Sequence, residues 1–134
     1  CHGCFDVLHF GHNRHFVEAK KAADILVVTV TPDRFVNKGE DRPIFSENYR
    51  AELLSGLEAI DYVALNEWES SVETLKLIRP DFYAKGSEYE SIDQNVNPLF
   101  NQEKEILLSF GGKMIFTYEE TSSSSDIVAK IKSL

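Results

Sequence analysis

The chain has 134 residues and a formal net charge of −8; 43% of its residues are hydrophobic and 27% are charged. These values suit one soluble globular domain over residues 1–134, and the acidic balance argues against a nucleic-acid binder, which would carry a basic patch. Apolar runs are too short to span a membrane, and two cysteines give no disulfide framework, so we expect a reducing, cytoplasmic setting.

The first half of the chain opens with a strand that ends near Cys4. Because the chain begins with Cys rather than Met, we expect it to be a fragment of a longer protein that lacks most of this strand. A helix is predicted over 14–23, and the β-branched run 25–30 is typical of a strand buried on both faces of a parallel sheet. Ser46 is a good N-cap for a helix that ends near residue 59.

The middle of the chain repeats the alternation. A strand is predicted over 61–65, and a strand over 81–85 follows the next helix. That helix is predicted over 70–78, where Ser70 and Glu73 have the spacing of a capping box.

The last third begins with a polar stretch over 88–97, which is predicted to be a loop. A helix over 98–110 follows, and Gly111–Gly112 supplies its C-terminal cap. A strand over 113–118 and a short helix over 126–133 complete the chain.

Strands that alternate with helices on short connections predict an α/β fold, a Rossmann-like doubly wound five-stranded parallel sheet with helices on both faces. Ligands of such sheets bind beyond the carboxyl ends of the strands. Residues 5–12, 85–86 and 121–124 all follow predicted strands, so we expect them to meet at one site.

The candidate functional side chains are concentrated at the start of the chain, where all four histidines lie within the first fifteen residues. His9 and His12 would share one face of a helix beginning near Gly11. Gly11 has no Cβ to keep a ligand from the backbone, and the free N–H groups of a helix N-terminus favour phosphate. This pattern predicts a phosphate site.

The run Gly3-x-Phe5-Asp6-x-x-His9-x-Gly11-His12 resembles the signature of the cytidylyltransferase-like nucleotidyltransferases. In that family the two histidines bind a nucleoside triphosphate and stabilise the transition state. The resemblance implies the same role for His9 and His12.

Three later segments are similar to the same family. The first, Lys38-Gly39 with Arg42 and Arg50, resembles a phosphate-binding segment. The second, Lys85-Gly86-Ser87-Glu88-Tyr89, resembles the Lys-Gly-Gly-Asp-Tyr run of heptose-1-phosphate adenylyltransferases. The third, Thr121–Ser125, stands where the family has an Ile-Ser-Thr-Thr-like motif. Glu88 replaces Asp, and serines replace the threonines. Tyr118-Glu119-Glu120 replaces the Arg-Thr pair of glycerol-3-phosphate cytidylyltransferases.

On matched positions the resemblance implies that His9, His12 and Lys38 are catalytic. The implied nucleotide-binding residues are Gly3, Cys4, Phe5, Asp6, Gly11, Arg42, Arg50, Lys85, Gly86, Glu88, Thr121, Ser123 and Ser124. No side chain is predicted as a metal ligand, because Mg²⁺ is expected to bind mainly through the triphosphate.

The implied reaction transfers NMP from ATP or CTP to a phosphorylated sugar or polyol and releases pyrophosphate. The resemblance also implies a homodimer and fusion to, or pairing with, a sugar kinase. No nucleic-acid or membrane partner is expected.

Other interpretations stay open. In one, His9 and His12 are structural histidines. In another, a metal is held by Cys4, His9, His12 and His15. The Cys1-His2-Gly3-Cys4 spacing also allows a redox site, although the helix would begin too late for one. A pantetheine-phosphate or nicotinamide-mononucleotide adenylyltransferase, and a catalytically silent nucleotide-binding regulatory domain, are the remaining alternatives.

Overall fold

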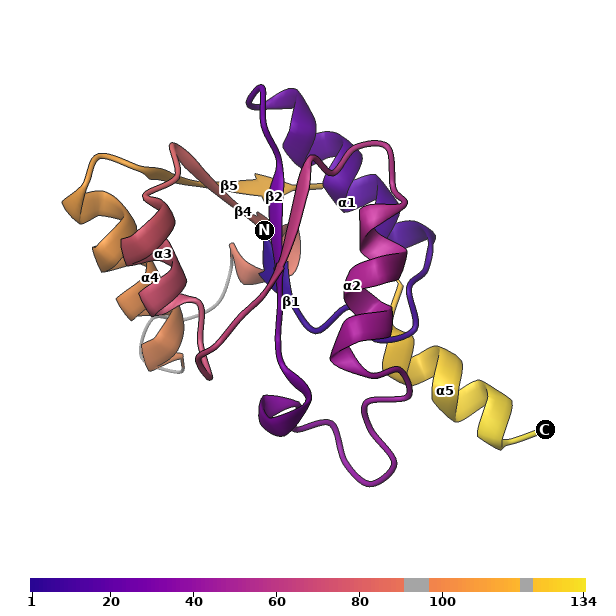
Figure 1. Ribbon diagram of the computed structural model, residues 1–134. Helices are drawn as coiled ribbons and strands as arrows, with labels where there is room; N and C mark the ends of the chain where they lie inside the picture. The colour runs from indigo at the N-terminus through magenta and orange to yellow at the C-terminus, as the bar shows by residue number, and fades with distance from the viewer. Residues whose placement is uncertain (91–96, 119–121) are drawn as a thin grey trace.

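The computed structural model describes residues 1–90, 97–118 and 122–134. These residues form an α/β fold with five α-helices and five strands (Figure 1). In chain order the elements are β1 (His2–Gly3), α1 (Phe10–Lys21), β2 (Val27–Val30), the 3-10 helix η1 (Asp33–Phe35), α2 (Glu47–Ser55), β3 (Tyr62–Leu65), α3 (Val72–Ile78), β4 (Phe82–Gly86), the 3-10 helix η2 (Ser87–Tyr89), α4 (Pro98–Ser109), β5 (Lys113–Thr117) and α5 (Ser124–Lys132).

The strands are all parallel, as predicted, but they do not form the predicted single five-stranded sheet. Within the described ranges they make a three-stranded sheet in the order β1-β2-β3 and a two-stranded sheet of β4 and β5. The two residues of β1 pair with Thr29 and Val30 of β2. On the other side of β1 an apolar cavity lies between these strands and β4, so β1 and β4 do not form a ladder.

The helices cover the strands from two sides (Figure 1). α3 and α4 lie together on one side, α1 and α2 lie on the other, and α5 extends away from the body near the C-terminus. The larger apolar core includes Phe16 of α1, Val28 and Val30 of β2, and Leu54 of α2, all fully buried. A smaller cluster of Leu75, Tyr83 and Leu107 joins α3, β4 and α4.

Two of the predicted helix ends are confirmed and one is wrong. The Ser46 side chain accepts a hydrogen bond from Tyr49 N and caps α2. At the end of α4, Gly111 has a φ of +82° and Gly112 N donates to Leu107 O at 2.9 Å. The capping box of Ser70 and Glu73 does not form, because α3 begins at Val72 and the Ser70 hydroxyl accepts from Val72 N instead.

Across residues 1–90, 97–118 and 122–134, none of the helices combines the length and the apolar character that crossing a membrane needs.

The tight turn after α4 yields a stability prediction. A Cβ added at Gly112 would lie 2.7 Å from Leu107 Cδ1 and 2.8 Å from Pro80 O. We expect Gly112→Ala to lower the free energy of unfolding by about 1–3 kcal/mol, because the Pro80 backbone cannot move away easily. Gly56→Ala is the control, since its added Cβ would meet only Leu53 O at 3.4 Å. Equal urea denaturation midpoints for the two variants would contradict the prediction.

Candidate active site

A polar cavity of about 380 Å³ lies where β1 and β4 end and α1 and α5 begin. Its volume falls within the range of small-molecule and cofactor sites, about 300–1,000 Å³. Of the predicted site residues, those that line it are Gly3, Cys4, Phe5, His9, Gly11, His12, Lys38, Lys85, Gly86, Glu88, Ser123 and Ser124. Thr121 lies outside the described residues.

The two motif histidines meet by stacking rather than through helix spacing. His9 is the N-cap of α1, not part of it, so the prediction that both rings lie on one helix face is wrong. His9 Nδ1 accepts from Gly11 N at 3.1 Å, and His12 Nδ1 accepts from His9 N at 3.2 Å. The ring centroids are 3.8 Å apart and the ring planes differ by 25°.

These hydrogen bonds decide where the imidazole protons lie. Because each Nδ1 accepts from a backbone N–H, the proton of each neutral ring is on Nε2. His9 Nε2 is buried and has no hydrogen-bond partner. A buried donor without a partner is costly, and a ligand oxygen in the cavity would satisfy it.

The surroundings keep both histidines neutral. Burial lowers the pKa of His12 to about 4, with smaller contributions from His9 and Lys38. Burial and then Lys38 also lower the pKa of His9. Near pH 7 the pair therefore offers two N–H donors and no charge, and the positive charge nearby comes from Lys38.

Gly11 is required by the close packing of its surroundings. A Cβ at this position would lie 3.0 Å from the His9 ring and 3.1 Å from Ser122 N. Gly11 thus brings the start of α1 against the segment that leads into α5. The two helix N-termini face the same cavity, and both favour an anion.

The serines before α5 are used in the fold itself. Ser123 is the N-cap of α5, and its hydroxyl accepts from Asp126 N at 3.3 Å. Ser124 Oγ donates to Val7 O at 3.0 Å and so fastens α5 to the loop that carries the histidines. Because both hydroxyls bond within the fold, these serines contribute to the cavity mainly by placing the N-terminus of α5 there.

Asp6 lies behind the cavity wall and organises it. Its carboxylate is fully buried and accepts from Ile44 N at 2.8 Å, Phe45 N at 3.0 Å and Arg42 Nε at 3.0 Å. Burial alone would raise the pKa of Asp6, but these hydrogen bonds outweigh it and the pKa lies below its ordinary value. Arg42 is held in turn, although its buried Nη2 has no hydrogen-bond partner.

Arg50 also acts within the fold. Its side chain is buried and donates to Cys4 O at 2.7 Å, Phe45 O at 3.0 Å and Asp33 Oδ1 at 2.7 Å. These bonds join α2 to the end of β1 and to η1. Asp6, Arg42 and Arg50 are absent from the cavity lining, so their predicted nucleotide contacts stay predictions.

Six lining residues were not predicted as nucleotide contacts: His2, His15, Ala84, Tyr89, Ser122 and Ser125. His15 Nδ1 lies 2.7 Å from Thr117 Oγ1, which ties α1 to β5. Its position one helical turn after His12 is a sequence signal that could have placed it in the cavity. Within the described ranges, no group of three or more His, Cys, Asp or Glu side chains is arranged to hold a metal ion.

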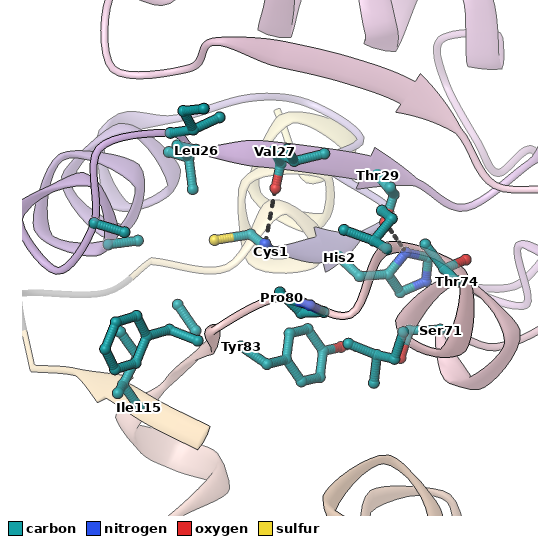
Figure 2. A pocket seen from close by; sticks show the side chains of 17 residues that line it. Cys1, His2, Leu26, Val27, Thr29, Ser71, Thr74, Pro80, Tyr83 and Ile115 are labelled. Atoms are coloured by element: carbon teal, nitrogen blue, oxygen red, sulfur yellow. Dashed lines mark hydrogen bonds between the residues drawn. The ribbon is translucent and has the colours of Figure 1, made fainter. Parts of the chain in front are cut away.

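A second, apolar cavity of about 90 Å³ lies between β1–β2 and β4 (Figure 2). The backbone nitrogen of Cys1 donates to Val27 O at 2.9 Å on one side of this cavity, and Tyr83 and Ser71 face it from the other. Burial lowers the pKa of His2 to about 4. This cavity is too small for a nucleotide, whereas the polar cavity contains the motif histidines and Lys38 and is therefore the candidate site.

The model of the family described as cytidylyltransferase-like matches residues 1–130. The chain belongs to the cytidylyltransferase-like family. This membership, together with the relatives below, supports nucleotidyltransferase activity.

Among curated relatives, the bifunctional protein HldE of Wolinella succinogenes is 38% identical over 132 residues, which are 97% of this chain and 26% of that protein. HldE of Helicobacter pylori is 37% identical over 134 residues, with 97% and 26% covered. The chain thus spans about a quarter of the length of these relatives. A crystal structure of a lipopolysaccharide core biosynthesis protein from Thermoplasma volcanium matches with a TM-score of 0.69 and 27% identity, covering 91% of this chain and 94% of that one.

The lowered pKa of His12 predicts a pH-dependent stability for this family member. The pKa is about 4 in the fold and about 6.5 in the unfolded chain, so the unfolded chain binds the extra proton between these values. The free energy of unfolding should therefore fall as the pH falls from about 6.5 to about 4. In His12→Gln, urea denaturation at several pH values should show a shallower fall, with His2, His9 and Asp6, whose pKa values are also lowered, supplying the remainder. An unchanged slope would contradict the assignment.

The buried Asp6 predicts a large loss of stability. Asp6→Asn removes the charge opposite Arg42 and turns one acceptor into a donor, so we expect a loss of about 3–5 kcal/mol. Glu73→Gln is the control, because its ion pair with Lys76 is exposed and should contribute at most about 1 kcal/mol. Similar urea midpoints for the two variants would rule out a central role for Asp6.

Proposed function

We propose that this chain is the nucleotidyltransferase domain that transfers NMP from ATP or CTP to a phosphorylated sugar or polyol and releases pyrophosphate. The observation that carries the proposal is the stacked pair of neutral imidazoles, with a buried and unpaired Nε2 on His9, in a cavity that Lys38 also lines. Two helix N-termini open onto the same cavity. All of these groups favour a polyphosphate.

The chemistry needs positioning rather than a covalent intermediate. An oxygen of the acceptor phosphate attacks the α-phosphorus, a new P–O bond forms, and the bond to the β-phosphate oxygen breaks as pyrophosphate leaves. Negative charge accumulates on the α-phosphate oxygens in the transition state. The Nε2–H groups of His9 and His12 would donate to those oxygens, and fixed donors of this kind need no reorganisation as the charge develops. Lys38 and the start of α5 would hold the leaving pyrophosphate.

Mg²⁺ fits this site as an ion carried mainly by the triphosphate. The described part of the cavity wall has a single carboxylate, that of Glu88. This agrees with the usual binding of Mg²⁺ in phosphate sites, where one or two carboxylates and the substrate phosphates hold the ion. When bound, it would neutralise charge on the phosphate oxygens.

The relatives support a phosphorylated sugar as the acceptor. One is described as a lipopolysaccharide core biosynthesis protein, and others as bifunctional proteins of which this chain matches about a quarter. A linked sugar kinase that makes the acceptor, and a homodimer, belong to the same proposal. Phe5-Asp6 and Lys85-Gly86 resemble the sugar-phosphate branch more than the pantetheine-phosphate or nicotinamide-mononucleotide enzymes.

The test is pyrophosphate release with ATP and CTP separately, in the presence of Mg²⁺. The acceptor panel contains sugar-1-phosphates, glycerol-3-phosphate, pantetheine phosphate and nicotinamide mononucleotide. We expect His12→Ala and His9→Ala each to lower kcat by about 10²–10³-fold, the usual loss when one transition-state donor is removed. The control is Asn13→Ala, an exposed change on the same helix.

Retained activity in both histidine variants would overturn the assigned roles. Nucleotide binding in calorimetry without turnover on any acceptor of the panel would favour a silent nucleotide-binding domain instead.

A further inference from the structure

Lys85 lines the cavity, but protein groups surround its ammonium. The side chain is 13% exposed, and Nζ lies 2.9 Å from Glu103 Oε2. The same nitrogen lies 4.5 Å from the ring centroid of Tyr89, 5.0 Å from that of Tyr83 and 5.7 Å from that of Phe100. One carboxylate and three aromatic faces thus hold this cation within a shell from β4, η2 and α4.

Glu103 is the buried anchor of this arrangement. It lies on α4 and is 4% exposed. Its Oε1 accepts from Ser71 Oγ at 2.5 Å, and Tyr83 Oη donates to the same serine at 3.1 Å. Burial and the Glu103 charge raise the pKa of Tyr83, so its hydroxyl keeps its proton and remains a donor.

The charges of this pair depend on each other. Oε2 of Glu103 has no conventional hydrogen bond, and the only cation that the described residues place against it is that of Lys85. If Lys85 turned toward a phosphate, a buried carboxylate would lose its counter-charge, which is strongly unfavourable. Lys85 is therefore poorly placed to bind phosphate, although the resemblance counts it among the nucleotide-binding residues.

What the pair does hold is the turn that follows β4. Tyr89, the last residue of η2, contacts Lys85 and stacks on Phe100 of α4 with 6.4 Å between ring centroids. Glu88 belongs to the same turn. Its carboxylate lies directly against Gly86, where an added Cβ would overlap it, and it lines the cavity.

We propose that Lys85 and Glu103 are a positioning pair that holds η2 against α4, so that the Glu88 carboxylate is presented to the nucleoside part of the nucleotide, and that Lys85 does not itself bind phosphate. The inference rests on the proposed function for the ligand. It adds to that function a residue, Glu103, which does not line the cavity. A carboxylate at this place accepts hydrogen bonds from hydroxyl or amino groups of a nucleoside.

Two substitutions separate the positioning role from direct phosphate binding. If Lys85 bound phosphate, Glu103→Gln would free the cation, and nucleotide would bind as tightly or more tightly, whereas Lys85→Met would weaken binding. A positioning pair predicts that both weaken the binding of ATP or CTP, each by about fivefold or more. It also predicts that the double variant is no weaker than either single variant, because both changes break one interaction.

The measurement is the Kd for ATP and for CTP by calorimetry, which does not require turnover. Lys85→Arg should restore most of the affinity, because a guanidinium keeps the charge and stacks on aromatic rings. Glu105→Gln on the exposed face of α4 and Lys113→Met at the exposed start of β5 are the matched controls. Circular dichroism and thermal unfolding establish that each variant is folded.

If Glu103→Gln does not fold, Phe100→Leu takes its place, since Phe100 does not line the polar cavity and the change removes the α4 ring on which Tyr89 stacks while leaving the buried ion pair intact. Weakened binding in this variant supports the positioning role, and parental affinity overturns it. Parental affinity in Glu103→Gln, or additive losses in the double variant, would also overturn the pair while the proposed function stands. A parent chain that binds neither nucleotide would defeat the proposed function, and the inference with it.

Discussion

The site depends on one buried carboxylate, that of Asp6. It follows the end of β1 and accepts three hydrogen bonds, two of them from the backbone of Ile44 and Phe45. An ionised carboxylate without partners could not remain in the interior, so the segment around residues 42–45 must close over it. Arg50 completes the closure through Cys4 O and Phe45 O. The loop that carries His9 is therefore held to the segment 42–45 by Asp6, Arg42 and Arg50, none of which lines the cavity.

The charge distribution in the cavity favours binding of an anion, although the protein as a whole is acidic. The formal net charge is −8, yet the cavity offers Lys38, two helix N-termini and two imidazoles that burial keeps neutral. Neutral rings can stack at 3.8 Å without repulsion and still donate through Nε2. The second cation at the wall, Lys85, is compensated by Glu103. Local attraction for phosphate thus arises from a few donors rather than from overall charge.

Whether a sequence prediction was confirmed depended on how far apart in the sequence the interacting residues lie. Ser46 and Gly111–Gly112 act as caps, as predicted, because capping depends on neighbours a few residues away. The Ser70–Glu73 box failed because two adjacent serines compete for one helix start, and tertiary packing of Ser71 against Glu103 decides between them. The single five-stranded sheet is not confirmed, because β1 pairs with β2 while a cavity lies between these strands and β4. Of the site segments, 5–12, 85–86 and 122–124 do converge on one cavity.

By itself, the sequence determined the succession of strands and helices, the parallel sheet type and the histidine motif with its glycine. These depend on periodicity, turn chemistry and spacing within a few residues. Only the tertiary structure decided which polar groups became partners: Asp6 with the backbone near residue 44, Arg50 with Cys4, and Lys85 with Glu103. A lysine or arginine in a sequence has the same charge whether it faces a ligand or a buried carboxylate. The choice is made by how distant segments pack, because a buried charge takes the counter-charge that the fold brings beside it.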